Sequence, residues 1–298
     1  MSRKGTTGEL TVRVADVTVS FISRGIPLEV SDPYPRFLVQ DGKADILMRV
    51  HYGALPRVAL GEKLYDTGTY WKLHRGQGKL VFSFASPFLG PVPYCLAVVS
   101  QDFSQGDLYF RARPDDPEQA LYPMQHPIDE LLMVNYLSQG KGLNIHACGV
   151  DPGGVGLAFV GVSGAGKSTI ARFWQERGAT ILSHDRLIVR KQDGHFFIHG
   201  TPWHGDPRAC LPAKAPLARL YFLKQAPENY IQPLAQAEAS RRLLVRCFPP
   251  FYLAQGMEFV LGFIEELTRQ VPCYELGFLP DDSAVEMVLQ HDGIGAPA

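Results

Sequence analysis

The N-terminal part of the chain alternates apolar and polar residues in short runs. From residue 9 to about residue 112 these runs are ELTVRVADVTVSFIS, ADILMRVHYG, TYWKLHR, KLVFSFAS, YCLAVVS and DLYFRAR. Such alternation is typical of half-buried β-strands, and turn-forming pairs such as Asp41-Gly42 separate the runs. The pattern predicts an antiparallel, β-rich N-terminal region.

The pattern changes near residue 126. Residues 127–137 begin with Pro and two acids and end before Gly140, which predicts a helix. Beyond a turn at 151–154, VGLAFVGV has the unbroken apolar character of a strand buried on both faces. STIARFWQER then predicts a helix ended by Gly178, and TILSHD predicts the next strand. Together they form a βαβ unit, whose two strands should be parallel with a right-handed crossover.

Several shorter elements complete the chain. LIVRKQ and HFFIHG, joined by Asp193-Gly194, predict a hairpin. A strand near residues 218–223, an amphipathic helix near 257–269 and a last strand, CYELGF, follow. We therefore expect an α/β protein, α+β overall, with a β-rich region over residues 1–125 and a second domain over residues 126–298.

Composition excludes several classes of protein. Apolar residues make up 46% of the 298 residues, which is typical of a globular chain. Lys and Arg number 29 against 30 Asp and Glu, so no general attraction to nucleic acid or anionic lipid is expected. The five cysteines include no CxxC pair, which argues against a disulfide framework and a zinc site. With no apolar leader and no run of about 20 apolar residues, we expect no membrane partner and a cytoplasmic location.

The segment GVSGAGKS, Gly161 to Ser168, matches the phosphate-binding (Walker A) pattern GxxxxGK[ST] between a predicted strand and a predicted helix. Its glycines allow backbone N–H groups to surround phosphates, and the helix start adds a positive dipole end. A glycine-rich turn without a ligand is the alternative, but it would not explain the Lys and Ser together. The predicted nucleotide-binding residues are Gly161, Ser163, Gly164, Ala165, Gly166, Lys167, Ser168 and Thr169.

Asp185 ends the second strand of the βαβ unit, so it should return to the sheet edge that carries this loop. There its carboxylate could hold Mg²⁺ together with the Ser168 hydroxyl, and could orient or deprotonate an attacking hydroxyl. Alternatively, Asp185 caps the following turn. His184, beside it, would be stabilised as a cation near a triphosphate, or it faces solvent.

Residues 144–206 resemble the HPr kinase/phosphorylase superfamily, which is related in its core to ATP-dependent phosphoenolpyruvate carboxykinases. The matching segments are IHACGV, GVSGAGKST and RGATILSHDRLIV. A looser resemblance, to HPr-kinase-like proteins found with peptide-modification gene clusters, extends from residue 127 to residue 288 through GTPWHG, FPPFY and CYELGFLPDDSAVEMV. The resemblance implies a P-loop core with a mixed sheet.

The resemblance also implies roles for single residues. Lys167 and Ser168 would serve phosphate and magnesium, His146 would lie on the active-site side, and Asp185 would be the second acid of an Asp-Asp pair whose first position is His184 here. We therefore take Asp185, Lys167, His146 and His184 as candidate catalytic residues. A homo-oligomer is compatible with the resemblance.

Two further features bear on the transfer of a phosphoryl group. The loop Thr201 to Asp206, which contains Trp203 and His204, either binds an acceptor or nucleotide or is a structural turn with Trp203 in the core. The spacing of His195, His199 and His204 does not favour zinc. Arginines that could meet the transferred group are Arg186, Arg208, Arg241, Arg242 and Arg246, with Arg208 the first choice.

These features together predict a kinase that uses ATP and Mg²⁺ and transfers the γ-phosphoryl group to a hydroxyl. The acceptor is a peptide or protein, through a serine for example, or a small molecule. A nucleotide-sensing module with weakened catalysis is the alternative from another class. Carboxykinase chemistry would need an oxaloacetate site and a second metal, for which the sequence offers no clear signal.

Overall fold

The computed structural model describes the chain except for residues 1–7, 41, 113–119, 204–209 and 295–298. These residues divide into two compact units, 1–136 and 137–298. The division falls inside helix α1 (Ile128–Leu137), whereas the sequence-based division at residue 125 precedes this helix.

The first unit is built on one large sheet. Its strands are β1 (Glu9–Val14), β2 (Val17–Ser23), β3 (Ile46–Gly53), β4 (Glu62–Asp66), β5 (Trp71–Gly76), β6 (Lys79–Phe84), β7 (Cys95–Ser100) and β8 (Gln105–Arg111). They lie in the order β1-β2-β3-β8-β7-β6-β5-β4. Short 3-10 helices, η1 (Tyr34–Phe37) and η2 (Pro87–Leu89), interrupt the connections.

The strands follow the predicted alternation, but the run ELTVRVADVTVSFIS forms two strands. Ala15 and Asp16 have positive φ angles of 52° and 58°, as a two-residue hairpin turn requires. The prediction of an antiparallel region is wrong for β3, which runs parallel to both β2 and β8. The residues between β2 and β3 return the chain to the end of the sheet at which β2 begins, so β3 runs in the same direction as β2. The alternation of apolar and polar residues within a strand carries no signal for that return.

The second unit holds a mixed sheet. Its strands are β9 (Leu143–Asp151), β10 (Gly156–Val160), β11 (Thr180–Ser183), β12 (Arg186–Gln192), β13 (His195–Gly200), β14 (Lys214–Gln225), β15 (Tyr230–Pro233) and β16 (Cys273–Phe278). Its helices are α2 (Lys167–Glu176), α3 (Gln236–Leu244), α4 (Ala254–Gln270) and α5 (Ser283–Asp292). The β12–β13 hairpin is confirmed, with Asp193 and Gly194 at φ angles of 48° and 83°.

The pairings in this sheet close a circuit. Strands β9 and β14 are long, and each pairs with different strands along its length. Adjacent strands follow the order β10, β9, β12, β13 and β14, and β14 also pairs with β10. Strands β10 and β11 both run antiparallel to β9, on its two sides, and are therefore parallel to each other. The predicted βαβ unit is thus confirmed as parallel, with β9 inserted between its strands.

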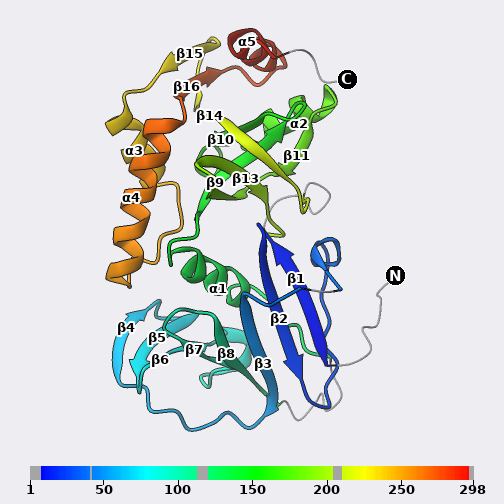
Figure 1. Cartoon of the computed structure of the whole chain (residues 1–298), viewed down its shortest axis with the longest axis vertical. Coiled ribbons are helices and arrows are strands. Elements are labelled where there is room, and N and C mark those ends of the chain that lie inside the picture. Colours follow the sequence, from blue (N-terminus) through cyan, green and yellow to red (C-terminus); the bar gives the residue numbers. More distant parts are fainter. Residues whose placement is uncertain (1–7, 41, 113–119, 204–209, 295–298) are drawn as a thin grey trace. The chain divides into compact units, whose positions relative to one another are not determined.

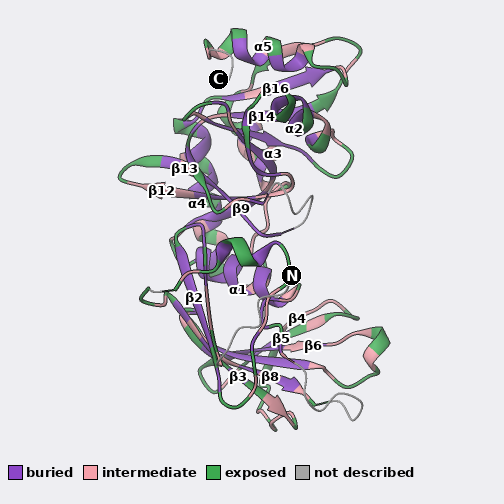
Figure 2. Cartoon of the chain, turned by 90° about the vertical axis from the view of Figure 1, so that its right-hand side faces the viewer, coloured by how far each residue is buried: buried purple, intermediate pink, exposed green. Residues whose placement is uncertain are grey.

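Helices cover both faces of this sheet. Helices α3 and α4 pack on one face through residues such as Leu243 and Ile264, while α2 and α5 pack on the other through residues such as Trp174 and Val288 (Figures 1 and 2). Buried apolar side chains on both faces explain why β10 is apolar at every position.

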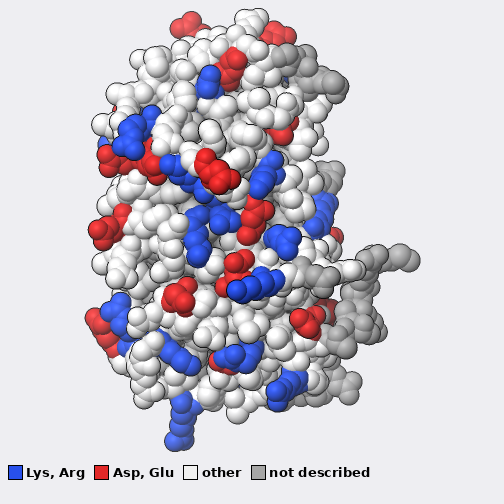
Figure 3. Space-filling view, viewed as in Figure 1, with Lys and Arg blue, Asp and Glu red and all other residues white. Residues whose placement is uncertain are grey.

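On the face shown in Figure 3, acidic and basic side chains are interspersed.

Candidate functional site

The GVSGAGKS loop joins the end of β10 to the start of α2. Strand β10 is hydrogen-bonded between β9 and β14, so the beginning of the loop is held on both sides. Gly164 and Gly166 have positive φ angles of 79° and 101°, which favour glycine, and Gly166 is the residue before the first turn of α2. The far side of the loop is tied to β14, where Gln225 Nε2 donates a hydrogen bond to the Gly164 carbonyl at 2.9 Å.

An aromatic ring from β16 packs directly against the loop. A Cβ atom at Gly166 would lie 2.4 Å from the ring of Phe278, which is itself 3% exposed. No side chain fits in that space, so glycine is required at position 166 for two reasons, its φ angle and this contact.

Lys167 is buried at the start of α2, with a side chain that is 6% exposed. Its ammonium donates to the carbonyl oxygens of Gly161, at 2.9 Å, and Val162, at 3.1 Å. It also lies 3.4 Å from Asp185 Oδ1. Burial lowers the pKa of Lys167, and the nearby Asp185 carboxylate partly opposes that shift.

Asp185 lies between β11 and β12, and its own carbonyl accepts a hydrogen bond from Ala147 N of β9 at 3.1 Å. Its Oδ1 is 2.8 Å from His146 Nε2, and its Oδ2 accepts from Arg186. Burial alone would raise the pKa of Asp185, but the His146 hydrogen bond and the charges of Arg186 and Lys167 outweigh it and hold the pKa well below its usual range. Asp185 is therefore a carboxylate at neutral pH.

His146 sits on β9, between Asp185 and the start of the loop. Gly161 N donates to its carbonyl at 3.2 Å, so the backbone fixes the strand against the loop. Its Nε2 lies 2.8 Å from both Asp185 Oδ1 and Lys167 Nζ. One ring nitrogen cannot donate to the first and accept from the second at once. Because Asp185 is ionised, we assign the proton to Nε2, donating to Asp185, while the Lys167 ammonium donates to the loop carbonyls.

An aromatic residue that the sequence analysis did not single out completes this cluster. The guanidinium of Arg186 stacks on Phe248, 4.0 Å from the ring centroid, and the His146 and Phe248 ring centroids are 6.0 Å apart. Phe248 N donates to the Asn144 carbonyl of β9 at 2.9 Å. Phe248 belongs to FPPFY, which carried only the looser family resemblance and no chemical signal of its own.

The structure thus brings together Lys167, His146 and Asp185. Ser168 lies exposed in the first turn of α2, Ser163 is exposed in the loop, and His184 is half-buried beside Asp185. The remaining predicted nucleotide-binding residues, Ala165 and Thr169, are half-buried.

The GTPWHG segment is only partly described. Thr201 Oγ1 donates to the Arg186 carbonyl at 2.8 Å, which fixes the segment's start beside the cluster. Trp203 is 4% exposed, as the structural alternative for this residue requires. His204, Asp206 and Arg208 lie outside the described residues.

The other candidate arginines differ in their partners. Arg241 and Arg242 donate to Glu238 within α3, and Arg242 also donates to Glu275 at 2.6 Å. Arg246 donates to the Arg242 carbonyl, and its own carbonyl accepts from His146 N at 2.7 Å. Arg186 alone among these described arginines contacts Asp185 directly.

Within the described ranges no three His, Cys, Asp or Glu side chains are grouped so as to hold a metal ion. None of the helices in that part of the chain is long and apolar enough to cross a membrane.

Comparisons with known proteins give matches among solved structures only. No protein-family model matches the chain, and no curated protein matches it. Among solved structures, the HPr(Ser) kinase/phosphatase from Coxiella burnetii is similar over 51% of this chain and 96% of its own, with 10% sequence identity and a TM-score of 0.31. A likeness of this size carries no functional conclusion for this chain.

Proposed function

We propose that the chain is an ATP-dependent kinase and that GVSGAGKS binds the phosphates of the nucleotide. The observation that carries this proposal is the placement of Lys167. Its buried ammonium lies at the start of a helix, against the carbonyls of a glycine-rich loop and 3.4 Å from a carboxylate. A lysine in this position can turn toward a bound phosphate as a point charge, while loop N–H groups and the dipole of α2 bind the same anion.

Mg²⁺ suits the oxygen atoms near this loop. The exposed Ser168 hydroxyl and the ionised Asp185 carboxylate are hard oxygen donors, and Mg²⁺ commonly takes one or two protein ligands together with phosphate oxygens and water. When bound, it would neutralise charge on the β and γ phosphates.

The proposed transfer moves the γ-phosphoryl group to a hydroxyl. The hydroxyl oxygen attacks the γ-phosphorus, the bond to the β–γ bridging oxygen breaks, and ADP and a phosphate ester are formed. The hydroxyl proton passes to the Asp185 carboxylate, directly or through water. Arg186, held by Asp185 and stacked on Phe248, would add positive charge beside the transferred group. A serine of a peptide or protein and the hydroxyl of a small molecule are both compatible acceptors.

A nucleotide-sensing module with weak or no catalysis is the second candidate. The observation that favours it is the engagement of both Asp185 oxygens, one by His146 and one by Arg186. A carboxylate held this way, with a depressed pKa, is a weak base. His184, where the family resemblance leads one to expect an acid, agrees with this alternative.

Nucleotide binding and turnover separate the two candidates. We would measure Mg-ATP affinity by calorimetry, and phosphate transfer from labelled ATP to lysate proteins, peptides and metabolites by mass spectrometry. Loss of one charge-assisted contact predicts that Lys167→Met weakens ATP binding about 10- to 100-fold. Lys214→Met, at an exposed lysine of the same unit, is the matched control and should bind normally.

The outcomes are distinct. ATP binding with transfer or hydrolysis that disappears in Lys167→Met supports the kinase. Tight Mg-ATP binding with neither transfer nor hydrolysis would favour the sensing module. Unchanged ATP affinity in Lys167→Met would contradict a phosphate-binding role for the loop.

A further inference from the structure

A row of apolar residues crosses the first unit's sheet near one end. The strand registers pair Tyr52 with Phe110, Phe110 with Cys95, Cys95 with Phe84, and Phe84 with Trp71. Directly paired residues share one face of a sheet, so these five side chains form a continuous line on five adjacent strands. The line is independent of the GVSGAGKS loop, which belongs to the second unit.

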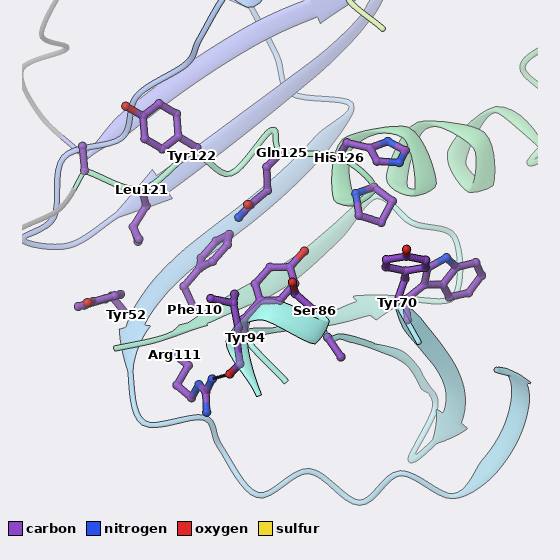
Figure 4. A pocket seen from close by; sticks show the side chains of 15 residues that line it. Tyr52, Tyr70, Ser86, Tyr94, Phe110, Arg111, Leu121, Tyr122, Gln125 and His126 are labelled. Atoms are coloured by element: carbon purple, nitrogen blue, oxygen red, sulfur yellow. Dashed lines mark hydrogen bonds between the residues drawn. The ribbon is translucent and has the colours of Figure 1, made fainter. Parts of the chain in front are cut away.

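A cavity of about 660 Å³ is lined in part by three residues of this row, Tyr52, Phe110 and Trp71. Its wall includes six aromatic side chains from several strands and loops, Tyr52, Tyr70, Trp71, Tyr94, Phe110 and Tyr122 (Figure 4). Cavities of about 300–1,000 Å³ lined by aromatic residues with a few polar groups are typical of small-molecule sites. The size and lining therefore favour an organic ligand with a planar or apolar body.

The charged side chains in the cavity wall indicate which charge the ligand should carry. Among the described residues that line the cavity, Arg111 is the single Arg, and none is Asp, Glu or Lys. Arg111 is half-buried, and within the described ranges no carboxylate lies at ion-pair distance from it. Its Nη2 donates to the Leu89 carbonyl at 3.0 Å, which holds the guanidinium at the wall (Figure 4). A half-buried guanidinium without a carboxylate partner favours an anion and opposes a cation.

Neutral hydrogen-bonding groups complete the wall. Burial, followed by the effects of Cys95 and Asp129, raises the pKa of Tyr94 to about 12, so its hydroxyl keeps its proton and can donate. The side chains of Ser86 and Gln125 also line the cavity (Figure 4). These groups can bind the polar atoms of a ligand whose ring stacks on the aromatic residues.

We propose that this cavity of the first unit binds a small organic anion, a carboxylate carried on an aromatic or similarly apolar body, with Arg111 contacting the carboxylate. The proposal does not depend on the kinase activity, because all the residues that carry it lie in the first unit. It assigns a ligand site to a region that the sequence analysis left without a role.

The experiment compares three probes of the same shape by calorimetry on the full chain at pH 7: 2-naphthoate, 2-naphthamide and 2-naphthylmethylammonium. We expect 2-naphthoate to bind at least about 10-fold more tightly than 2-naphthamide, and the ammonium to bind weakest, because a charge-assisted contact with Arg111 is available to the carboxylate alone. In Arg111→Gln the preference for 2-naphthoate should disappear while 2-naphthamide affinity stays within about twofold.

Control variants fix the location. Arg57→Gln, at an exposed arginine of the same unit that does not line the cavity, should leave all three affinities unchanged. Ala120→Trp, which places an indole in the cavity, should abolish binding of all three probes. Lys167→Met should bind 2-naphthoate as the wild type does, which separates this site from the nucleotide site.

Each contrary result overturns the proposal at a definite point. Equal affinity of the wild type for the carboxylate and the amide, or tightest binding of the ammonium, would refute the anion class whether or not Arg111→Gln folds. A preference that persists in folded Arg111→Gln would refute the role of Arg111. No binding of any probe at millimolar concentration would refute the site.

Discussion

Glycine at position 166 is required by two separable physical effects, and a set of alanine substitutions measures each. In Gly166→Ala, an L residue would have to adopt a φ angle of 101°, and its Cβ would lie 2.4 Å from the Phe278 ring. The left-handed backbone costs about 1–2 kcal/mol, and overpacking typically adds about 1–3 kcal/mol. We therefore expect Gly166→Ala to destabilise the second unit by about 2–5 kcal/mol.

Substitution of two other glycines separates the backbone cost from the cost of the close contact: Gly164 carries the backbone cost alone, and Gly262 carries neither. Gly164 has a φ angle of 79°, and nothing lies within 4 Å of the position that a Cβ would occupy there, so Gly164→Ala should cost only the backbone contribution of about 1–2 kcal/mol. Gly262 lies inside α4 in open space, so Gly262→Ala should stabilise by roughly 0.5–1 kcal/mol. In a double-mutant cycle with Phe278→Leu, about 1–3 kcal/mol of the cost of Gly166→Ala should be recovered.

Urea unfolding followed by tryptophan fluorescence is the assay. The chain has three tryptophans, and in a Trp71→Phe background the remaining two, Trp174 and Trp203, both lie in the second unit. Trp174 packs in the same core cluster as Phe278, so it reports on the region that is changed. If Gly166→Ala proved no more destabilising than Gly164→Ala, or if the cycle showed no coupling to Phe278, the close-contact argument would be refuted.

Two carboxylates give predictions for stability against pH. Because the pKa of Asp185 is lowered in the folded state, its contribution to stability is present above about pH 4 and is lost as the pH falls through the folded value. Asp185→Asn should therefore have a lower free energy of unfolding than the wild type at pH 7, measured by urea unfolding, and should lose less of it as the pH falls. If the free energies of unfolding of the two proteins fell in parallel below about pH 4, this reasoning would be contradicted. Glu275, 9% exposed, accepts from Arg242 and Tyr230, which outweigh the effect of burial and lower its pKa to about 2. Glu275→Gln should destabilise the second unit by about 2 kcal/mol at pH 7 in urea unfolding, with the difference narrowing between about pH 4.5 and pH 2. The control Glu266→Gln, at a side chain that is 34% exposed and paired with Lys191, should cost less than about 1 kcal/mol. An equal loss of stability in both variants would refute the argument from burial.

The local elements could be predicted from the sequence, because their signals lie within a few residues. The hairpin at Asp193-Gly194 and the strand–loop–helix around Lys167 each carry their own turn or motif residues. Pairings between distant strands carry no such signal. The parallel course of β3, and the insertion of β9 between β10 and β11, depend on which strands meet after long connections.

The candidate site shows the same limit. Strand order placed Asp185 near the loop, because the ends of parallel strands share an edge, and the structure puts it 3.4 Å from Lys167. His146 was reached only through a family resemblance, since nothing local distinguishes it from another half-buried histidine. Gln225 and Phe278, which tie and pack the loop, come from strands far along the chain, and only the folded sheet reveals their contacts.

The closed circuit of strands in the second unit has a consequence for how the protein folds. Strand β10 needs β14 as well as its neighbour β9, and α2, β11, β12 and β13 all lie between β10 and β14 in the chain. Closing so long a segment costs chain entropy before the pairing stabilises it, and sheets with such non-local contacts fold slowly. The tie from Gln225 to the loop also forms only once β14 has docked. The proposed binding of nucleotide should therefore begin only after the residues of β14 have left the ribosome, although the GVSGAGKS segment leaves it earlier.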